Sequence, residues 1–244
     1  MEKKKMKLWK KILIVLAILL IILIIFIGRK VIILSNLDNK VSDYENNYKN
    51  IYIKTIFDYN DYKSESERFV KDNVDKLVIE KTDNTGEKSK IIQITYENER
   101  KMFTEANGNK IMNVYKEETA VRGAHIEDSA NFSYSVIRNF AYATSLPERI
   151  LDAIVTKIKL VEIDNKQCYE LSSTHNSNFL YSENTSEMKA YVEKDTGLPV
   201  KMIEVVNENG ERKENISTFE CKFNIVTDED IKEPNNDEYK LQEL

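Results

Sequence analysis

The residues best suited to chemistry are few and widely spaced. His125 and His175 stand fifty positions apart, and neither belongs to an H-x-x-x-H or H-E-x-x-H pattern, the spacings that direct two imidazoles at one zinc ion. The chain has no G-x-S-x-G sequence, phosphate-binding glycine loop or D-x-D-x-D-G calcium loop. The acidic run Asp228–Asp230 could attract a cation, but such a run after a strand is more typical of a solvated turn. We therefore expect no enzyme activity, no metal site and no cofactor.

The two cysteines raise the question of a disulfide. Alternation along the strand predicted to end the domain places Cys221 on the apolar face with Phe219. In the strand from Gln167 to Ser173 the same alternation places Cys168 on the polar face. Thiols on opposite faces of one sheet cannot reach the Cα separation of roughly 5.5 Å that a disulfide needs. Strand alternation therefore argues against a bridge, although two separate sheets or a β-bulge would allow one.

The amino terminus has the composition of a membrane anchor. The sixteen residues from Ile12 to Ile27 include no polar side chain. As a helix they span roughly 24 Å, slightly less than a hydrocarbon core of about 30 Å. Residues 31–34 extend the apolar run if Arg29 and Lys30 reach outward to the membrane surface. Six lysines precede the run, so the positive-inside rule places the N-terminus in the cytoplasm and the rest of the chain outside.

Three other fates of this segment are less consistent with the sequence. A cleaved signal peptide needs small residues after the apolar core, and none follows Ile27 in that pattern. A bacterial lipoprotein needs a cysteine there, whereas the first one is Cys168. A buried helix of a soluble protein would carry a polar face. We expect a single-pass cell-membrane protein with a cytoplasmic tail (1–11), a transmembrane signal anchor (12–34) and an extracytoplasmic domain (35–244), bound to the lipid bilayer through residues 12–34.

Composition and charge exclude several classes of protein. The chain has 244 residues, of which 41% are hydrophobic, with only six glycines and three prolines, so it can form a packed core and is neither collagen-like nor Pro/Gly-rich disordered. Its net charge of -5 combines a basic start, +6 over residues 1–29, with an acidic remainder of -11. An acidic domain binds nucleic acid poorly, because phosphate neutralisation requires clustered Lys and Arg. We expect no nucleic-acid partner.

The pattern of the external part predicts two groups of strands with one helical region between them. A helical stripe at Leu37, Val41 and Tyr44 predicts a short helix rising from the membrane. β-rich runs separated by turns follow on both sides of a helical middle, at 51–57, 76–80, 90–96, 100–105, 110–115, 157–163, 167–173, 188–193, 198–206 and 216–226, with a short edge at 239–241. Strands that succeed one another without intervening helices favour antiparallel pairing.

The helical middle supplies the candidate ligand-binding residues. Residues 131–144 show helical spacing of apolar side chains, and Pro147 stands where a second helix could start. Together the two predicted helices carry enough apolar surface to seal one face of a sheet. These side chains either line a hydrophobic cavity or simply form the core, since both need the same apolar stripe. They are Phe132, Val136, Phe140, Leu146, Ile150, Leu151 and Ile154.

The C-terminal third contains a recognisable sequence motif. Residues 168–171 (CYEL) are followed by residues 190–201 (AYVEKDTGLPVK), then by the strand 219–223 and the acidic residues 228–231. This motif resembles that of the lipoprotein-carrier superfamily, LolA/RseB-like, in its membrane-anchored Gram-positive form. The resemblance implies an unclosed barrel, an α+β fold whose large curved antiparallel sheet is covered on one face by helices. It also implies a concave face that takes acyl chains or other hydrophobic partners.

Two functional hypotheses follow. The first is a membrane-tethered domain that binds a lipid or a lipoprotein acyl chain between the curved sheet and the lid helices. Retention of an anchor favours a tethered receptor or sensor over a shuttle between membranes. The alternative is a non-enzymatic interaction or sensor module in a cell-envelope complex, with its cavity filled by its own side chains and an envelope protein as partner. A cavity would favour the first hypothesis, and a solid core beside an exposed strand edge would favour the second.

Overall fold

The computed structural model describes residues 2–47, 49–59, 62–116, 136–137, 140, 145–174, 185–208 and 210–242. Within them the chain forms one long helix, a short helix and strands. The helices are α1 (Glu2–Asn47), α5 (Leu146–Val155) and a 3-10 turn, η2 (Asn236–Glu238). The strands are β1 (Asn50–Tyr59), β2 (Tyr62–Lys71), β3 (Val74–Asp83), β4 (Lys88–Thr95), β5 (Glu99–Ala106), β6 (Asn109–Lys116), β7 (Lys157–Ile163), β8 (Lys166–Ser173), β9 (Thr185–Glu193), β10 (Pro199–Glu208), β11 (Glu211–Phe223) and β12 (Lys240–Gln242).

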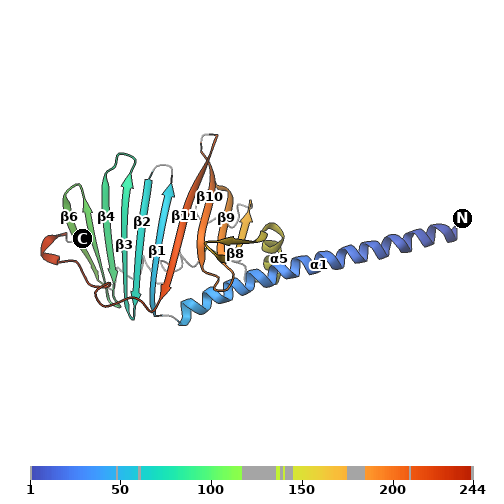
Figure 1. The fold of residues 1–244 in the computed structure, drawn as a ribbon, viewed down its shortest axis with the longest axis horizontal. Coiled ribbons are helices and arrows are strands. Elements are labelled where there is room, and N and C mark those ends of the chain that lie inside the picture. Colours follow the sequence, from blue (N-terminus) through green and yellow to red (C-terminus); the bar gives the residue numbers. More distant parts are fainter. Residues whose placement is uncertain are drawn as a thin grey trace.

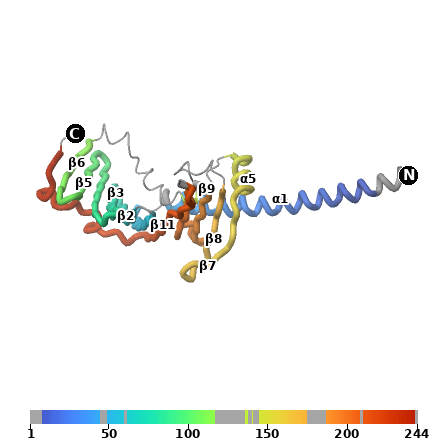
Figure 2. Tube along the Cα trace, turned by 90° about the horizontal axis from the view of Figure 1, so that it is seen from above, coloured from blue at the N-terminus to red at the C-terminus, as the bar shows by residue number. Residues whose placement is uncertain are grey.

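All of these strands belong to one open sheet. Their order is β12-β6-β5-β4-β3-β2-β1-β11-β10-β9-β8-β7. Every pairing is antiparallel except that of β12 with β6, and the central pair joins the first strand of the domain to the last long one. Figure 1 shows the strands side by side, and Figure 2 shows the sheet as an arc with α1 and α5 on its inner side. The predicted α+β fold with a curved, unclosed antiparallel sheet is confirmed.

Helix α1 is a single uninterrupted helix with two different environments. From Ile12 to Phe26 its large apolar side chains are 44–66% exposed. Further along, Leu34, Leu37 and Val41 are 0–3% exposed in the core of the domain. The predicted stripe at Leu37 and Val41 is therefore helical, but it continues the N-terminal helix and packs on the sheet. In Figure 1 the first half of α1 projects from the domain as a rod.

The turn between β9 and β10, which lies in the C-terminal sequence motif, holds α1 in place. The ammonium group of Lys40 donates a hydrogen bond of 2.9 Å to the backbone oxygen of Lys194. Gly197 has φ +78°, and a Cβ built on it would lie 3.0 Å from the backbone oxygen of Leu37. Thr196 stabilises the turn from inside, because its hydroxyl accepts a bond of 3.2 Å from the amide of Leu198. A glycine is required here both by conformation and by the closeness of the helix.

The outer face of the sheet is covered by the last residues of the chain, 227–242, which we call the C-terminal strap. Figure 1 shows it crossing from the end of β11 to β6. Glu233 accepts hydrogen bonds from Lys101 at 2.8 Å and from the hydroxyl of Tyr96 at 2.6 Å. Tyr239 packs edge-on against Phe103, with ring centroids 5.0 Å apart. The strap thereby closes a second, smaller apolar cluster around Ile92, Ile94 and Phe103.

Most predicted strands are present, and one was missed. The runs on both sides of the helical middle correspond to β1, β3 to β6 and β7 to β11, and the expected short edge is β12. Strand β2 was not predicted, because its sequence YKSESERFVK is polar on both faces. Its inward side chains Ser64 and Arg68 are nevertheless buried. The helix expected over 131–144 lies almost wholly outside the described residues.

Candidate hydrophobic-ligand site

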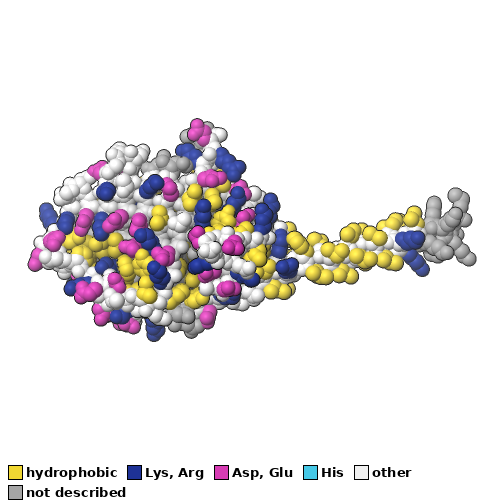
Figure 3. Space-filling view, viewed as in Figure 1, with side chains coloured by type: hydrophobic (Ala, Val, Ile, Leu, Met, Phe, Trp, Pro, Cys, Tyr) yellow, Lys and Arg dark blue, Asp and Glu magenta, His cyan; other side chains and the backbone are white. Residues whose placement is uncertain are grey.

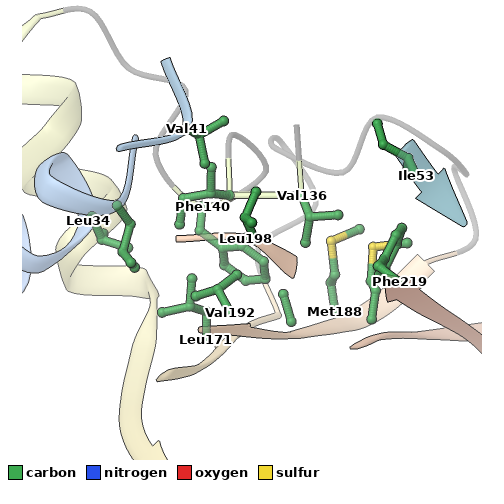
Figure 4. Close-up of a cluster of buried hydrophobic side chains, with 14 of the residues drawn as sticks. Leu34, Val41, Ile53, Val136, Phe140, Leu171, Met188, Val192, Leu198 and Phe219 are labelled. Atoms are coloured by element: carbon green, nitrogen blue, oxygen red, sulfur yellow. The ribbon is translucent and has the colours of Figure 1, made fainter. Parts of the chain in front are cut away.

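The main apolar cluster lies between the inner face of the sheet and the elements packed on it. Strand alternation turns one apolar row of β1 and β8 to β11 toward this face, including Ile53, Leu171, Met188 and Phe219. Helix α1 contributes its core residues from the opposite side. Figure 4 shows side chains from the helix and from the strands converging on one volume. This cluster is the largest continuous apolar region that the described residues place inside the fold.

A short piece of the helical middle inserts into the cluster. Val136, Ile137 and Phe140 are only 1–2% exposed. In Figure 4 the ring of Phe140 lies among Leu198 of the turn and Val192 of β9. Two of the predicted ligand-binding residues, Val136 and Phe140, are thus brought together on the inner face. Phe132, a third, lies outside the described residues.

The other four predicted residues do not face the cluster. Leu146, Ile150, Leu151 and Ile154 of α5 are 38–65% exposed, whereas Asp152 and Ala153 on the opposite side of the helix are buried. The reason is the attachment of α5 to α1. Lys30 donates hydrogen bonds of 3.0 and 2.7 Å to the backbone oxygens of Ala153 and Thr156, at the end of α5 where carbonyl groups lack helical partners. This docking turns the apolar stripe of α5 outward.

The same bonds correct the expected position of Lys30. From sequence its side chain was expected to reach outward to the membrane surface, but its ammonium group is held by α5. Val31 and Ile33 pack at the edge of the cluster, and Leu34 lies within it. Of the apolar residues after Arg29, Val31, Ile33 and Leu34 therefore pack in the domain, whereas Ile32 is 61% exposed.

The main apolar cluster on the inner face reaches Val70 of β2 at its border. Across β2 and β3 the same face carries a buried ion pair, in which the Nε of Arg68 lies 2.8 Å from an oxygen of Asp75. Both residues are buried, at 4% and 6% exposure. Asn113 of β6 is also buried on this side. The main apolar cluster therefore lies mostly on the half of the inner face formed by β1 and β7 to β11.

The remaining candidate groups give no second site among the described residues. Both cysteines are free: Cys168 is buried, and Cys221 is half-buried on the apolar face as alternation predicted. Burial raises the pKa of the Cys221 thiol to about 12, which suppresses the reactive thiolate. In the acidic run, Asp230 accepts a 2.7 Å bond from the backbone amide of Thr227. Within the described ranges no group of His, Cys, Asp and Glu could hold a metal, and His125 and His175 lie outside them.

Sequence reasoning missed the strand and helix residues that form most of the site. Met188, Ala190 and Val192 of β9 are fully buried in the cluster, and Leu37 of α1 is only 2% exposed there. Their alternation in β9 was a usable signal. The stripe on α1 was recognised, but its neighbour in space is the β9–β10 turn, more than 150 positions away. Proximity of that kind is not encoded in local spacing.

Comparison with known proteins gives low similarities. No family model matches the chain, and no curated protein matches it. An uncharacterised conserved protein from Thermus thermophilus aligns with 9% identity and a TM-score of 0.46, covering 86% of this chain and 98% of that one. MucB, solved in complex with MucA(peri), aligns with 12% identity and a TM-score of 0.35, covering 82% of this chain and 59% of MucB.

A LolA superfamily protein from Nitrosomonas europaea also aligns, with 10% identity and a TM-score of 0.27, covering 82% of this chain and 97% of that one. The fold assignment itself rests on the sheet topology described above.

Proposed function

We propose that this protein is a membrane-tethered, non-enzymatic domain that binds a hydrophobic ligand, a lipid or a lipoprotein acyl chain, on the inner face of its sheet. The observation that carries the proposal is the insertion of Val136, Ile137 and Phe140 into an apolar cluster otherwise built from the sheet and α1. An acyl chain has the same chemistry as these three side chains. Displacing them would open a groove along β8 to β11, at a gain of about 0.8 kcal/mol for each buried CH₂ group of the ligand.

The tether is supported by the first half of α1. Residues Leu8–Tyr44 are long and apolar enough to cross a membrane, and their most apolar 18-residue window has a mean hydropathy of 3.3 with 0% of it buried. Lysines precede this stretch, so we propose that the N-terminus is cytoplasmic and the sheet lies outside. Because Leu34 belongs to the core, we place the lipid-facing part at about residues 12–27 and the start of the domain near residue 28.

A protein-binding role is the second candidate, and a specific observation favours it. The cluster is already filled by the protein's own side chains, and β7 ends the described sheet with no further strand beside it. A free edge strand can accept a strand from a partner. Its exposed charges Lys157, Lys159 and Glu162 discourage indiscriminate pairing and would make such a partner specific. An envelope protein is the partner of this second proposal.

A photoreactive fatty acid tests the ligand proposal on the full chain. Cells that express the protein are given a fatty acid with a diazirine in its chain, irradiated, and the adducts are located by mass spectrometry. We expect adducts in two places: in residues 12–27, from bulk lipid, and in β8 to β11, from bound ligand. The variant Phe140→Ala removes the largest inserted side chain and is expected to raise the adduct yield at the strands.

Ile56→Ala is the matched control, because Ile56 of β1 is 41% exposed and alternation turns it to the outer face of the sheet, so its loss should leave the yield unchanged. Adducts confined to residues 12–27 in wild type and in Phe140→Ala would contradict the ligand proposal while leaving the tether intact. A photoreactive amino acid in place of Lys159 of β7 that becomes crosslinked to an envelope protein would instead favour the second candidate.

A further inference from the structure

Helix α5 presents an apolar stripe that nothing in the described structure covers. Its four large apolar residues, Leu146, Ile150, Leu151 and Ile154, lie on one side of a ten-residue helix and are 38–65% exposed. The helix is buried only at Asp152 and Ala153. A helix of a soluble domain normally has the opposite arrangement, with its apolar side against the core. The stripe therefore fits an apolar environment outside the domain.

The position of α5 along α1 shows which environment that is. Lys30, which binds the end of α5, follows Phe26 by four residues, or about 6 Å along the helix axis. Phe26 ends the continuous run of strongly exposed apolar side chains, beyond which Ile32 is also 61% exposed. Because side chains extend about 5 Å from a helix axis, the near side of α5 lies at the level where the rod ends. Figures 1 and 2 together show α5 lying across α1 at this junction.

The length of the rod brings this junction into the membrane surface. Sixteen residues from Ile12 to Ile27 span about 24 Å, whereas a hydrocarbon core is about 30 Å thick. The continuation of α1 cannot supply the difference, since Val31 and Leu34 pack in the domain. A short span is accommodated when the flanking structure sits within the boundary between headgroups and acyl chains. The flanking structure here is α5.

We propose that α5 is an interfacial membrane helix, with its apolar stripe inserted into the lipid leaflet on the side of the domain. This rests on the proposed tether and adds a second attachment to it. Figure 3 shows the hydrophobic surface of the rod running up to the body of the protein. The stripe of α5 lies where that surface meets the domain, and Arg29 and Lys157 are exposed in the adjoining segments, where anionic headgroups would meet them. The sheet would then be held at a fixed distance and orientation from the bilayer.

Tryptophan fluorescence in brominated lipid tests this proposal with the full chain. The chain has a single tryptophan, Trp9, which is replaced by phenylalanine to give a silent background. Leu151→Trp is then introduced, and the protein is reconstituted in phosphatidylcholine and phosphatidylglycerol vesicles whose acyl chains are brominated near the glycerol end. We expect strong loss of fluorescence, as for a side chain about 5–10 Å below the headgroups. Ile154→Trp serves as a second reporter on the same stripe.

Two controls separate the possible failures. Leu241→Trp is matched in exposure, 51% against 52% for Leu151, but lies on β12 at the far edge of the sheet, and should not be quenched. Leu20→Trp, which lies near the middle of the proposed span, reports the tether and should be quenched when the acyl chains are brominated near their methyl ends. If Leu20→Trp is quenched while both α5 reporters behave like Leu241→Trp, the stripe is covered by protein, such as a second copy, and the inference is overturned with the tether intact. An unquenched Leu20→Trp would overturn the tether and the inference together.

Discussion

Single residues in the β9–β10 turn decide how closely α1 can approach the sheet. Gly197 has a positive φ and lies against the backbone of Leu37. The ammonium group of Lys40 donates a hydrogen bond to the backbone oxygen of Lys194 in the same turn. The turn was recognised in the sequence from its residue types alone. That the turn packs against α1, from the other end of the chain, is shown only by the tertiary structure.

We expect Gly197→Ala to lower the free energy of unfolding by more than the cost of placing an alanine in the left-handed backbone conformation. A left-handed backbone at a residue with a Cβ costs roughly 1–2 kcal/mol, and here the Cβ also meets a carbonyl oxygen at 3.0 Å. Gly86→Ala is the control, since Gly86 has φ +84° with nothing within 4 Å of the added atom. The free energy of unfolding by denaturant gives both costs. Equal losses for the two variants would show that α1 does not press on this turn.

At the scale of elements, the C-terminal strap and α1 cover opposite faces of one sheet by different means. Helix α1 buries apolar side chains, whereas the strap is fixed largely by charged and hydrogen-bonded contacts such as those of Glu233. Burial alone would raise the pKa of Glu233, but hydrogen bonds from Lys101 and Tyr96 outweigh it, so the pKa lies below its ordinary value. The attachment of the strap is therefore sensitive to acid.

The sign of this dependence follows from linkage. A carboxylate with a lowered pKa contributes stability that is complete above its ordinary value of about 4.3 and is lost as the pH falls through the folded value. We expect the melting temperature of the wild type to fall as the pH drops from 6 to 3. Glu233→Gln should be less stable at pH 6 and show a shallower fall. Parallel pH curves for the two proteins would exclude Glu233 as a source of the acid sensitivity.

At the scale of the whole molecule, the proposed tether and the domain share one helix, α1. The expected division near residue 35 would remove Leu34 from a core in which it is 3% exposed. The proposed tether is also a core element, so it would transmit the orientation of the sheet to the membrane rigidly, whereas a flexible linker would not. This continuity supports the proposal of a fixed receptor over that of a mobile carrier.

Two truncations test this shared use of α1. Residues 28–244 keep Leu34, Leu37 and Val41, and we expect this fragment to fold in the absence of detergent. Residues 45–244 lose all three, each worth about 2–5 kcal/mol by analogy with core truncations, against a total stability of about 5–15 kcal/mol. We expect the second fragment to lack near-ultraviolet circular dichroism. A folded 45–244 fragment would show that α1 is only an anchor.

Features that depend on local order could be predicted from the amino-acid sequence. Alternation and turn residues predicted most strands and the opposite faces of Cys168 and Cys221, and an unbroken apolar run predicted the anchor-like helix. These patterns are readable because a side chain's face follows from its position within its own element. Strand β2 escaped detection because its inward polar residues, Arg68 among them, are compensated by partners on other strands.

Which apolar surfaces meet could be learned only from the folded chain. The stripes of α1 and α5 are both apolar in sequence, yet one enters the core and the other is exposed. The difference arises from Lys30, whose bonds to the end of α5 orient that helix across more than 120 positions of chain. Hydrophobic burial is non-directional, so a stripe specifies that it will be covered but not by what. The partner of each stripe is fixed by packing between distant segments.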